Sequence, residues 1–111
     1  MQWYHGTTLE KLGSILEIGF VPEKGVFGKG VYFSSSKEGA RIFGTHIIRI
    51  AVDDAHILHL TYEDLKEDPI ENEAWFKRIK RQDCPAIAMN YTSGECELVI
   101  YDMAVIREIY Y

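Results

Sequence analysis

Apolar residues recur at helical spacing near the start of the chain, where four of them fall on one face of a helix. They are Leu9, Leu12, Ile15 and Leu16. Thr7 and Glu10 form a capping-box pattern, in which a hydroxyl at the helix start is answered by a carboxylate three residues on. Gly19 supplies a left-handed stop. The pattern predicts an amphipathic helix over residues 8–18, after a short strand from Gln2 to His5.

Glycine and proline dominate the next segment, residues 20–30, which is therefore predicted to be a loop. The following residues, Val31 to Phe33, are typical of a strand fragment. Ser35 and Glu38 form a second capping-box pattern, which predicts a short helix running to about Phe43. The order is therefore loop, strand, turn, helix.

Runs rich in Ile, Val and aromatic residues predict further strands. They are His46–Val52, Ala55–Leu60, Ala86–Asn90, Glu97–Tyr101 and Val105–Tyr110. The first two are joined through Asp53-Asp54 and are interpreted as successive strands or a hairpin. Strands at both ends with helices between them, and no regular alternation of strand and helix, favour a single α+β domain over residues 1–111 with mostly antiparallel pairing.

An acidic segment, Asp64 to Glu73, is broken by Pro69, and the segment from Asn72 to Arg81 carries apolar residues at helical spacing. Trp75 and Phe76 there are either part of the core or an exposed contact patch. The basic residues between Lys77 and Arg81 are interpreted as a solvated helix face.

Composition narrows the class of protein. The chain has 111 residues, of which 47% are hydrophobic, which indicates a folded globule. The net charge of −5 argues against a protein that binds nucleic acid through its phosphate backbone. The sequence has no apolar run long enough to cross a bilayer, and its two cysteines have no metal-like spacing. We expect a cytoplasmic protein with free thiols, no membrane partner and no bound metal.

Three residues are candidates for chemistry, and each also has a purely structural interpretation. His5 precedes Gly6 at a strand end and faces either a cleft or the core. Tyr32 follows two glycines and either stacks on a planar ligand or packs in the core. Glu97 leads into a strand beside a turn, where it either meets a substrate or protects a sheet edge.

The order and surroundings of these residues are more specific than each alone. The chain resembles the diphtheria-toxin-like, His-Tyr-Glu class of ADP-ribosyltransferases, which includes the poly(ADP-ribose) polymerases. The resemblance rests on three blocks: His5-Gly6-Thr7, the segment Phe27–Phe33, and the segment Glu97–Asp102. It implies split antiparallel β-sheets around an NAD cleft, with short flanking helices.

The resemblance also implies a role for each matching position. His5 would bind a ribose hydroxyl, the Gly6 backbone would hold the nicotinamide carboxamide, and Tyr32 would stack on nicotinamide. Glu97 would stabilise the oxocarbenium-like transition state, so the implied catalytic residues are His5, Tyr32 and Glu97. The implied NAD-binding residues are His5, Gly6, Thr7, Gly30, Tyr32, Phe33 and Phe43.

The chain departs from the polymerase pattern after the tyrosine strand. It has Lys37-Glu38-Gly39-Ala40 where the polymerases carry a serine that grips the carboxamide, and the loop before Glu97 is short. These departures from the polymerases favour transfer of a single ADP-ribose over elongation of a polymer. Glu95 forms a Glu-x-Glu pair with Glu97, which in arginine-directed relatives holds the acceptor guanidinium; a solvated turn residue is the alternative.

The sequence thus predicts an NAD-dependent mono-ADP-ribosyltransferase, with NAD as co-substrate and a macromolecule or small molecule as acceptor. An NAD glycohydrolase would use the same residues with water as the acceptor. A non-catalytic module that binds NAD or ADP-ribose is the third possibility.

Overall fold

The computed structural model describes residues 2–25, 27–62 and 84–111 as a strand-rich α+β domain with two α-helices. The helices are α1 (Leu9–Ile18) and α2 (Lys37–Arg41). The strands are β1 (Gln2–Thr7), β2 (Glu23–Gly25), β3 (Gly28–Ser34), β4 (His46–Val52), β5 (Ile57–Thr61), β6 (Ala86–Asn90), β7 (Cys96–Ile100) and β8 (Ile106–Tyr110). Short 3₁₀ turns, Asp54–His56 and Met103–Val105, precede β5 and β8.

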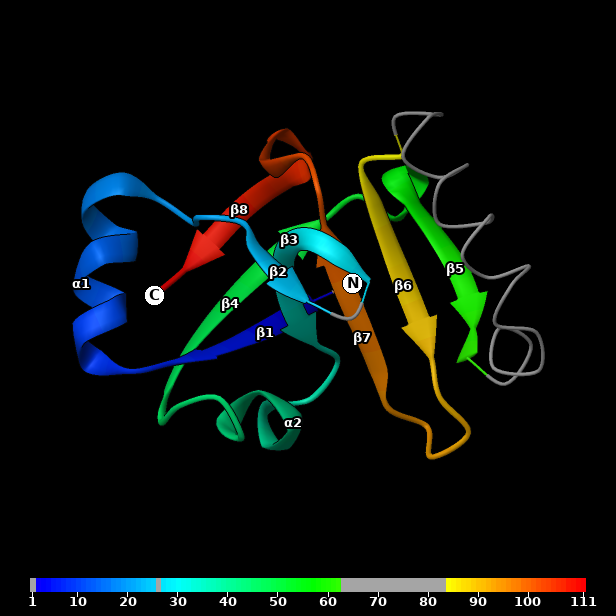
Figure 1. The fold of residues 1–111 in the computed structure, drawn as a ribbon, viewed down its shortest axis with the longest axis horizontal. Helices are drawn as coiled ribbons and strands as arrows, with labels where there is room; N and C mark the ends of the chain where they lie inside the picture. Colours follow the sequence, from blue (N-terminus) through cyan, green and yellow to red (C-terminus); the bar gives the residue numbers. More distant parts are fainter. Residues whose placement is uncertain (1, 26, 63–83) are drawn as a thin grey trace.

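The strands follow one hydrogen-bonded path in the order β5-β6-β7-β3-β1-β4-β8, and β2 pairs with β3. All of these pairings are antiparallel except that of β5 with β6. β1 pairs with β4 along its whole length but with β3 at one residue pair, Tyr4 with Ser34. Figure 1 shows β1 and β4 crossing the view at an angle to β6 and β7. The β1–β3 junction is therefore where the sheet changes direction.

Side-chain alternation along the strands gives the sheet two apolar faces. One face carries the larger cluster, which includes Trp3, Phe33, Ile50 and Leu98, and α1 packs against it through Leu12 and Ile15. The opposite face carries a smaller cluster. Its buried members are Phe27, Ile87, Met89 and Val99. Burial on both faces explains why β6 and β7 are almost continuously apolar in sequence.

Both helices begin after a hydroxyl residue, and α1 ends at a glycine. The Lys11 amide donates to the Thr8 hydroxyl, 3.2 Å away, so Thr8 is the N-cap of α1, and Gly19 ends the helix with a φ of +83°. Thr7 belongs to β1. In α2 the Gly39 amide donates to the Ser36 hydroxyl at 3.0 Å, which makes Ser36 the N-cap. The predicted helix at 8–18 is therefore confirmed, one residue shorter at its start.

Several expectations from the sequence are wrong in detail. His46–Val52 and Ala55–Leu60 correspond to successive strands, but the hairpin alternative is wrong: β4 lies between β1 and β8, whereas β5 lies at the far edge of the sheet beside β6. Asp53 caps the intervening 3₁₀ turn through the Ala55 amide, and this turn redirects the chain. The second helix ends at Arg41 rather than near Phe43.

Other differences are extensions of predicted elements. β1 continues to Thr7, β3 begins at Gly28, and the predicted loop over residues 20–30 contains β2. The acidic segment and the predicted helix between residues 64 and 81, with Trp75 and Phe76, lie outside the described residues.

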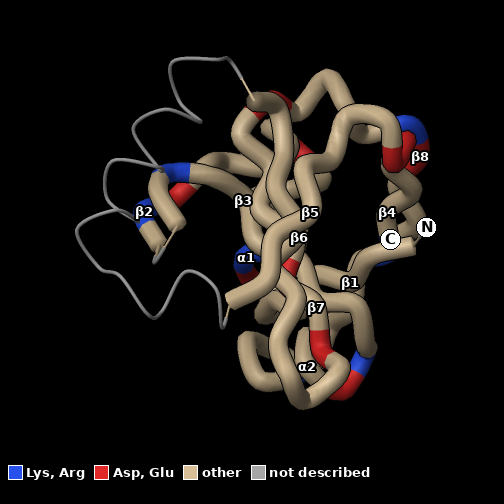
Figure 2. Tube along the Cα trace, turned by 90° about the vertical axis from the view of Figure 1, so that its right-hand side faces the viewer, with Lys and Arg blue, Asp and Glu red and all other residues tan. Residues whose placement is uncertain are grey.

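Charged residues are spread along the described chain rather than gathered on one element. In Figure 2, both the Lys and Arg positions and the Asp and Glu positions are scattered over the visible tube. Among the described residues, no helix has the length and apolar character needed to cross a membrane.

Candidate active site

A pocket of about 470 Å³ opens on the sheet face opposite α1, beside the junction of β1 with β3. β1, β3, α2 and the β6–β7 hairpin all contribute to its lining. The aromatic lining residues are Tyr4, Tyr32, Phe33, Phe43 and Tyr91. Three carboxylates, those of Glu38, Glu95 and Glu97, also line it, and no Lys or Arg of the described chain does. The pocket therefore combines aromatic surface with negative charge.

Tyr32 lies in the middle of β3 and lines this pocket. Its hydroxyl donates to the Gly28 carbonyl at 2.8 Å and accepts from the Phe27 amide at 2.9 Å. A Cβ on Gly25 would lie 2.4 Å from the same hydroxyl, so the backbone of β2 packs over the outer end of the ring. Burial is the main cause that raises the pKa of Tyr32, which keeps the hydroxyl protonated at neutral pH.

His5 lies on β1, but its ring is on the other face of the sheet and is not part of the pocket lining. It packs between Phe20 and Phe33, with ring centroids 5.4 Å away in both cases. Its Nδ1 lies 2.8 Å from the backbone carbonyl oxygen of Tyr32. A carbonyl accepts only, so Nδ1 carries the hydrogen and Nε2 is the free acceptor. Burial lowers the pKa of His5, which favours this neutral form.

Glu97 lies on β7, directly opposite Ser34 of β3, on the same sheet face as Tyr32. Its side chain lines the pocket, and one carboxylate oxygen, Oε2, accepts a hydrogen bond from the Tyr91 hydroxyl at 3.1 Å. The structure thus brings Tyr32 and Glu97 together directly. It connects His5 to them through the backbone of Tyr32.

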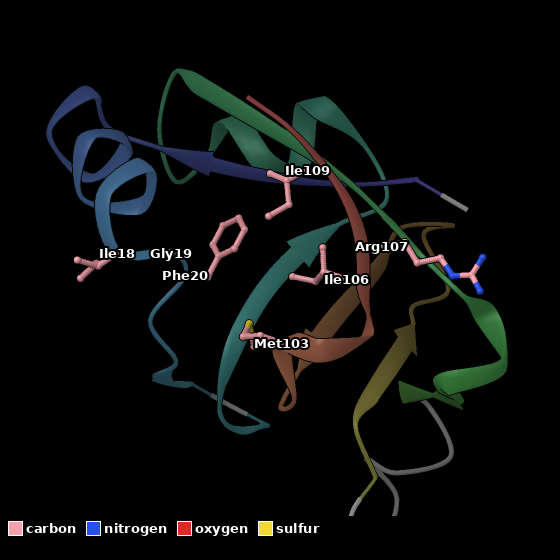
Figure 3. A pocket seen from close by; sticks show the side chains of 7 residues that line it. All are labelled: Ile18, Gly19, Phe20, Met103, Ile106, Arg107 and Ile109. Atoms are coloured by element: carbon pink, nitrogen blue, oxygen red, sulfur yellow. The ribbon is translucent and has the colours of Figure 1, made fainter.

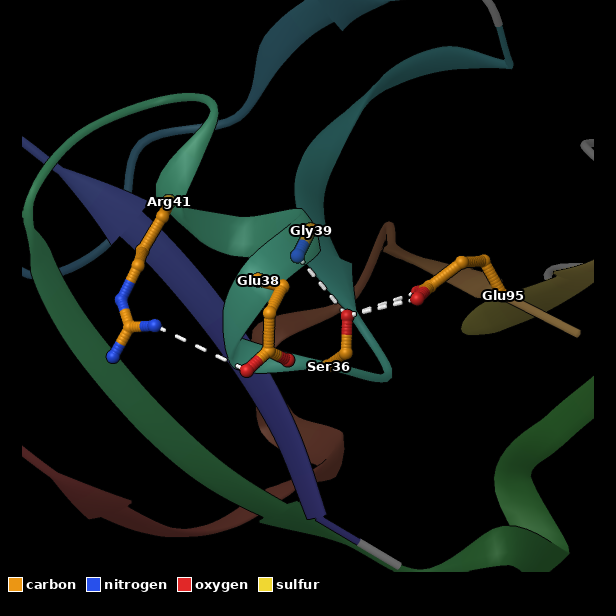
Figure 4. A network of polar contacts seen from close by, with 5 residues as sticks. All are labelled: Ser36, Glu38, Gly39, Arg41 and Glu95. Atoms are coloured by element: carbon orange, nitrogen blue, oxygen red, sulfur yellow. Dashed lines mark hydrogen bonds and ion pairs between the residues drawn. The ribbon is translucent and has the colours of Figure 1, made fainter.

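Glu95 also lines the pocket, but its carboxylate is already engaged. The Ser36 hydroxyl donates to it at 3.0 Å and the Ser35 hydroxyl at 3.4 Å. Figure 4 shows the same Ser36 hydroxyl accepting from the Gly39 amide at the start of α2, with Glu95 reaching in from the β6–β7 hairpin. Glu95 therefore ties that hairpin to the N-terminus of α2. A nearby ion pair joins Glu38 to Arg41 at 4.0 Å.

Two glycines that were predicted to bind NAD, Gly6 and Gly30, allow close packing in the fold. A Cβ on Gly6 would lie 1.7 Å from the carbonyl oxygen of Ala40, so the backbone of α2 packs directly on β1. A Cβ on Gly30 would lie 2.8 Å from both the Ile100 carbonyl oxygen and the Val99 side chain. Gly6 still lines the pocket, whereas Gly30 does not.

The remaining predicted NAD-binding residues are in different environments. Phe43 lines the pocket and is 71% exposed, at the turn that follows α2. Phe33 lines the pocket in part, although its ring belongs to the larger core cluster. Thr7 is 2% exposed, does not line the pocket, and its hydroxyl has no hydrogen-bond partner among the described residues.

Neither cysteine is placed for nucleophilic chemistry. Both thiols are free, and Cys96 lines the pocket. Burial, followed by the charges of Glu97 and Glu95, raises the pKa of Cys96 to about 11. Because the thiolate is the nucleophile, this raised pKa disfavours the reactive form of Cys96 at neutral pH. No cluster of three or more potential metal ligands occurs in the described part of the chain.

A second pocket, of about 360 Å³, lies on the face that carries α1. Figure 3 shows it between the end of α1 and the segment leading into β8, with Phe20, Met103 and Ile109 around it. Its one charged lining residue, Arg107, is paired with Asp53 at 3.2 Å. This pocket lacks the carboxylates that distinguish the first.

Sequence reasoning missed Tyr91 as a site residue. The signal was present, because the predicted strands around the Ser93-Gly94 turn would place residues 91 and 97 diagonally across a hairpin on one face.

Comparison with known proteins does not assign the chain to a family. No protein-family model matches the chain, and no curated protein is similar enough to count as a relative.

Proposed function

We propose that this protein is an NAD-dependent mono-ADP-ribosyltransferase. The observation that carries the proposal is the shared pocket of Tyr32 and Glu97, which come from adjacent strands, with His5 hydrogen-bonded to the backbone of Tyr32. These are the three residues on which the sequence resemblance rests. They come together from positions 27 and 65 residues apart in the chain.

The character of the pocket suits the nicotinamide end of NAD. The nicotinamide ring of NAD is planar and positively charged, so it is attracted both to aromatic faces and to carboxylates. Tyr32 supplies an aromatic ring held by two hydrogen bonds, and Phe43 is a second aromatic at the pocket. Glu38, Glu95 and Glu97 supply the negative charge.

The proposed reaction begins when the bond between the nicotinamide nitrogen and the ribose breaks. Its electron pair leaves with nicotinamide, which becomes neutral, and positive charge develops on the ribose. A fixed carboxylate in a partly dry pocket stabilises that charge, which is the role we assign to Glu97. The acceptor then attacks the anomeric carbon and loses a proton.

The finer fold that we propose is the split-sheet arrangement of ADP-ribosyltransferases. The single residue pair between β1 and β3 supports it, because β1, β4 and β8 lie on one side of that junction and β3, β7, β6 and β5 on the other. The pocket lies beside the junction, where a split-sheet enzyme would bind NAD.

In this proposal His5 and Gly6 act at the junction. The Gly6 backbone lines the pocket and is available to the carboxamide. The resemblance assigns a ribose hydroxyl to His5, but its ring lies on the opposite face of the sheet from the pocket, so the role that we propose for His5 is to brace the Tyr32 backbone through Nδ1. The resemblance also assigns acceptor binding to Glu95; the contacts with Ser35 and Ser36 support an additional role in fixing α2 against the hairpin.

Incubation of the purified protein with labelled NAD and a cell lysate tests this function. We expect free nicotinamide to accumulate together with label on an acceptor, and the acceptor to be identified from the labelled species. Nicotinamide release without label on any acceptor would instead identify an NAD glycohydrolase. Binding of NAD with neither signal would identify a non-catalytic module and contradict the enzyme proposal.

A further inference from the structure

Tyr91 holds the Glu97 carboxylate from a position that the β6–β7 hairpin fixes. The hairpin closes with the Tyr91 amide donating to the Glu95 carbonyl at 3.0 Å and the Gly94 amide donating to the Tyr91 carbonyl at 3.1 Å. Asn90 pairs with Cys96 and Met89 with Glu97, so residues 91 and 97 are diagonal neighbours on one face. Diagonal neighbours are about 7–8 Å apart at the backbone, a span that a tyrosine side chain covers.

The Tyr91 ring is held independently of its hydroxyl. Its centroid lies 5.0 Å from that of Tyr62, and it packs against the smaller apolar cluster. Burial, followed by the nearby charge of Glu97, raises the pKa of Tyr91, so the hydroxyl remains a donor at neutral pH. The ring is therefore a fixed support, and its hydroxyl donates to Glu97 in the pocket.

The hydrogen bond engages one oxygen of the carboxylate, Oε2, and the other oxygen, Oε1, has no hydrogen-bond partner among the described residues. A carboxylate has two oxygens and about four acceptor positions, so the second oxygen can meet substrate while the first is held. Catalytic groups work best when their rotamer is fixed before substrate binds.

We propose that Tyr91 is a positioning residue that presents the Glu97 carboxylate to the nicotinamide ribose. This role rests on the proposed NAD-cleaving function. It is distinct from the roles of His5, Tyr32 and Glu97, because Tyr91 acts through Glu97 and not on NAD.

Tyr91→Phe tests the role, because it removes the hydroxyl and keeps the ring and its stacking. Hydrogen bonds to charged groups are strong enough that we expect kcat for nicotinamide release to fall about tenfold to a hundredfold. We expect KM for NAD to change less than about threefold, since the substrate contacts remain. Tyr110→Phe is the matched control: it removes a hydroxyl that donates to Glu108 on β8, outside the pocket, and should leave kcat unchanged.

A double-mutant cycle separates positioning from a general effect on the fold. In the Glu97→Gln background, Tyr91→Phe should lower the residual kcat less than about twofold, because the carboxylate that it positions is gone. The same fold loss in both backgrounds, or a Tyr91→Phe rate equal to wild type, would overturn the positioning role alone. If wild type itself releases no nicotinamide, the proposed function fails and the role of Tyr91 fails with it.

Discussion

At the scale of single residues, the most informative side chain is His5, whose ring packs in the core, one of the two environments that the sequence allowed. The alternation of β1 puts Tyr4 and Gly6 on the pocket face and His5 with Trp3 on the core face. The imidazole nevertheless reaches the backbone carbonyl of Tyr32 at 2.8 Å. His5 therefore contributes to the position of Tyr32 from the core face of the sheet and does not line the pocket.

His5 should make stability depend on pH. Burial lowers its pKa below the ordinary value of 6.5, so below that pH the unfolded chain binds a proton more readily than the folded protein. The stabilisation that comes from burying His5 in its neutral form is complete above about pH 6.5. It is lost as the pH falls through the pKa of His5 in the folded protein. Urea unfolding between pH 5 and 7.5 should show wild type losing stability more steeply than His5→Gln. Parallel curves for the two proteins would contradict this account.

At the scale of elements, the sequence indicates where helices and strands begin but not how strands pair. Thr8, Gly19 and Ser36 mark helix ends through local hydrogen bonds and backbone geometry, which is why these ends were predictable to within a residue or two. The position of β5 beside β6 depends on contacts between distant segments. Local pattern carries no information on such contacts, so the sequence left open whether β4 and β5 are only successive strands or pair as a hairpin.

The packing of α2 on β1 gives a direct test of an element contact. Gly6→Ala would place a methyl group 1.7 Å from the Ala40 carbonyl oxygen, so either the helix or the strand must move. We expect a loss of at least about 2 kcal/mol in the free energy of unfolding. Chemical denaturation of the purified variant measures it.

Gly13→Ala is the matched control for that variant. Gly13 lies in α1 and has no atom near the site of an added Cβ, so the same substitution should stabilise the protein by about 0.5–1 kcal/mol. Equal effects at positions 6 and 13 would show that α2 does not pack on β1 as described.

At the scale of the whole molecule, the fold brings together three blocks that are widely spaced in sequence. The predictions of an α+β class and of mainly antiparallel pairing are confirmed. The meeting of β7, β3 and β1 as neighbours was expected only through the resemblance, because strand order depends on long-range pairing. The hydrogen bond of Tyr91 with Glu97 was not predicted for a similar reason: it follows from the predicted turn only when the strand register is added.

The charge of the molecule also bears on how it would bind NAD. The net charge is −5, and the pocket is lined by carboxylates without a described Lys or Arg. This distribution favours the cationic nicotinamide end over the pyrophosphate as the group held in the pocket. The central claim is therefore that Glu97 acts on the bond between nicotinamide and ribose.

Nicotinamide release and NAD affinity, measured side by side for wild type and Glu97→Gln, test that claim most directly. We expect Glu97→Gln to lower kcat at least about a hundredfold, because it removes the charge that stabilises the transition state. The Kd for NAD should stay within about threefold of wild type. Glu17→Gln on α1, outside the pocket, is the control and should match wild type. A Glu97→Gln variant with the wild-type rate, or a wild-type protein that binds NAD without releasing nicotinamide, would contradict the claim.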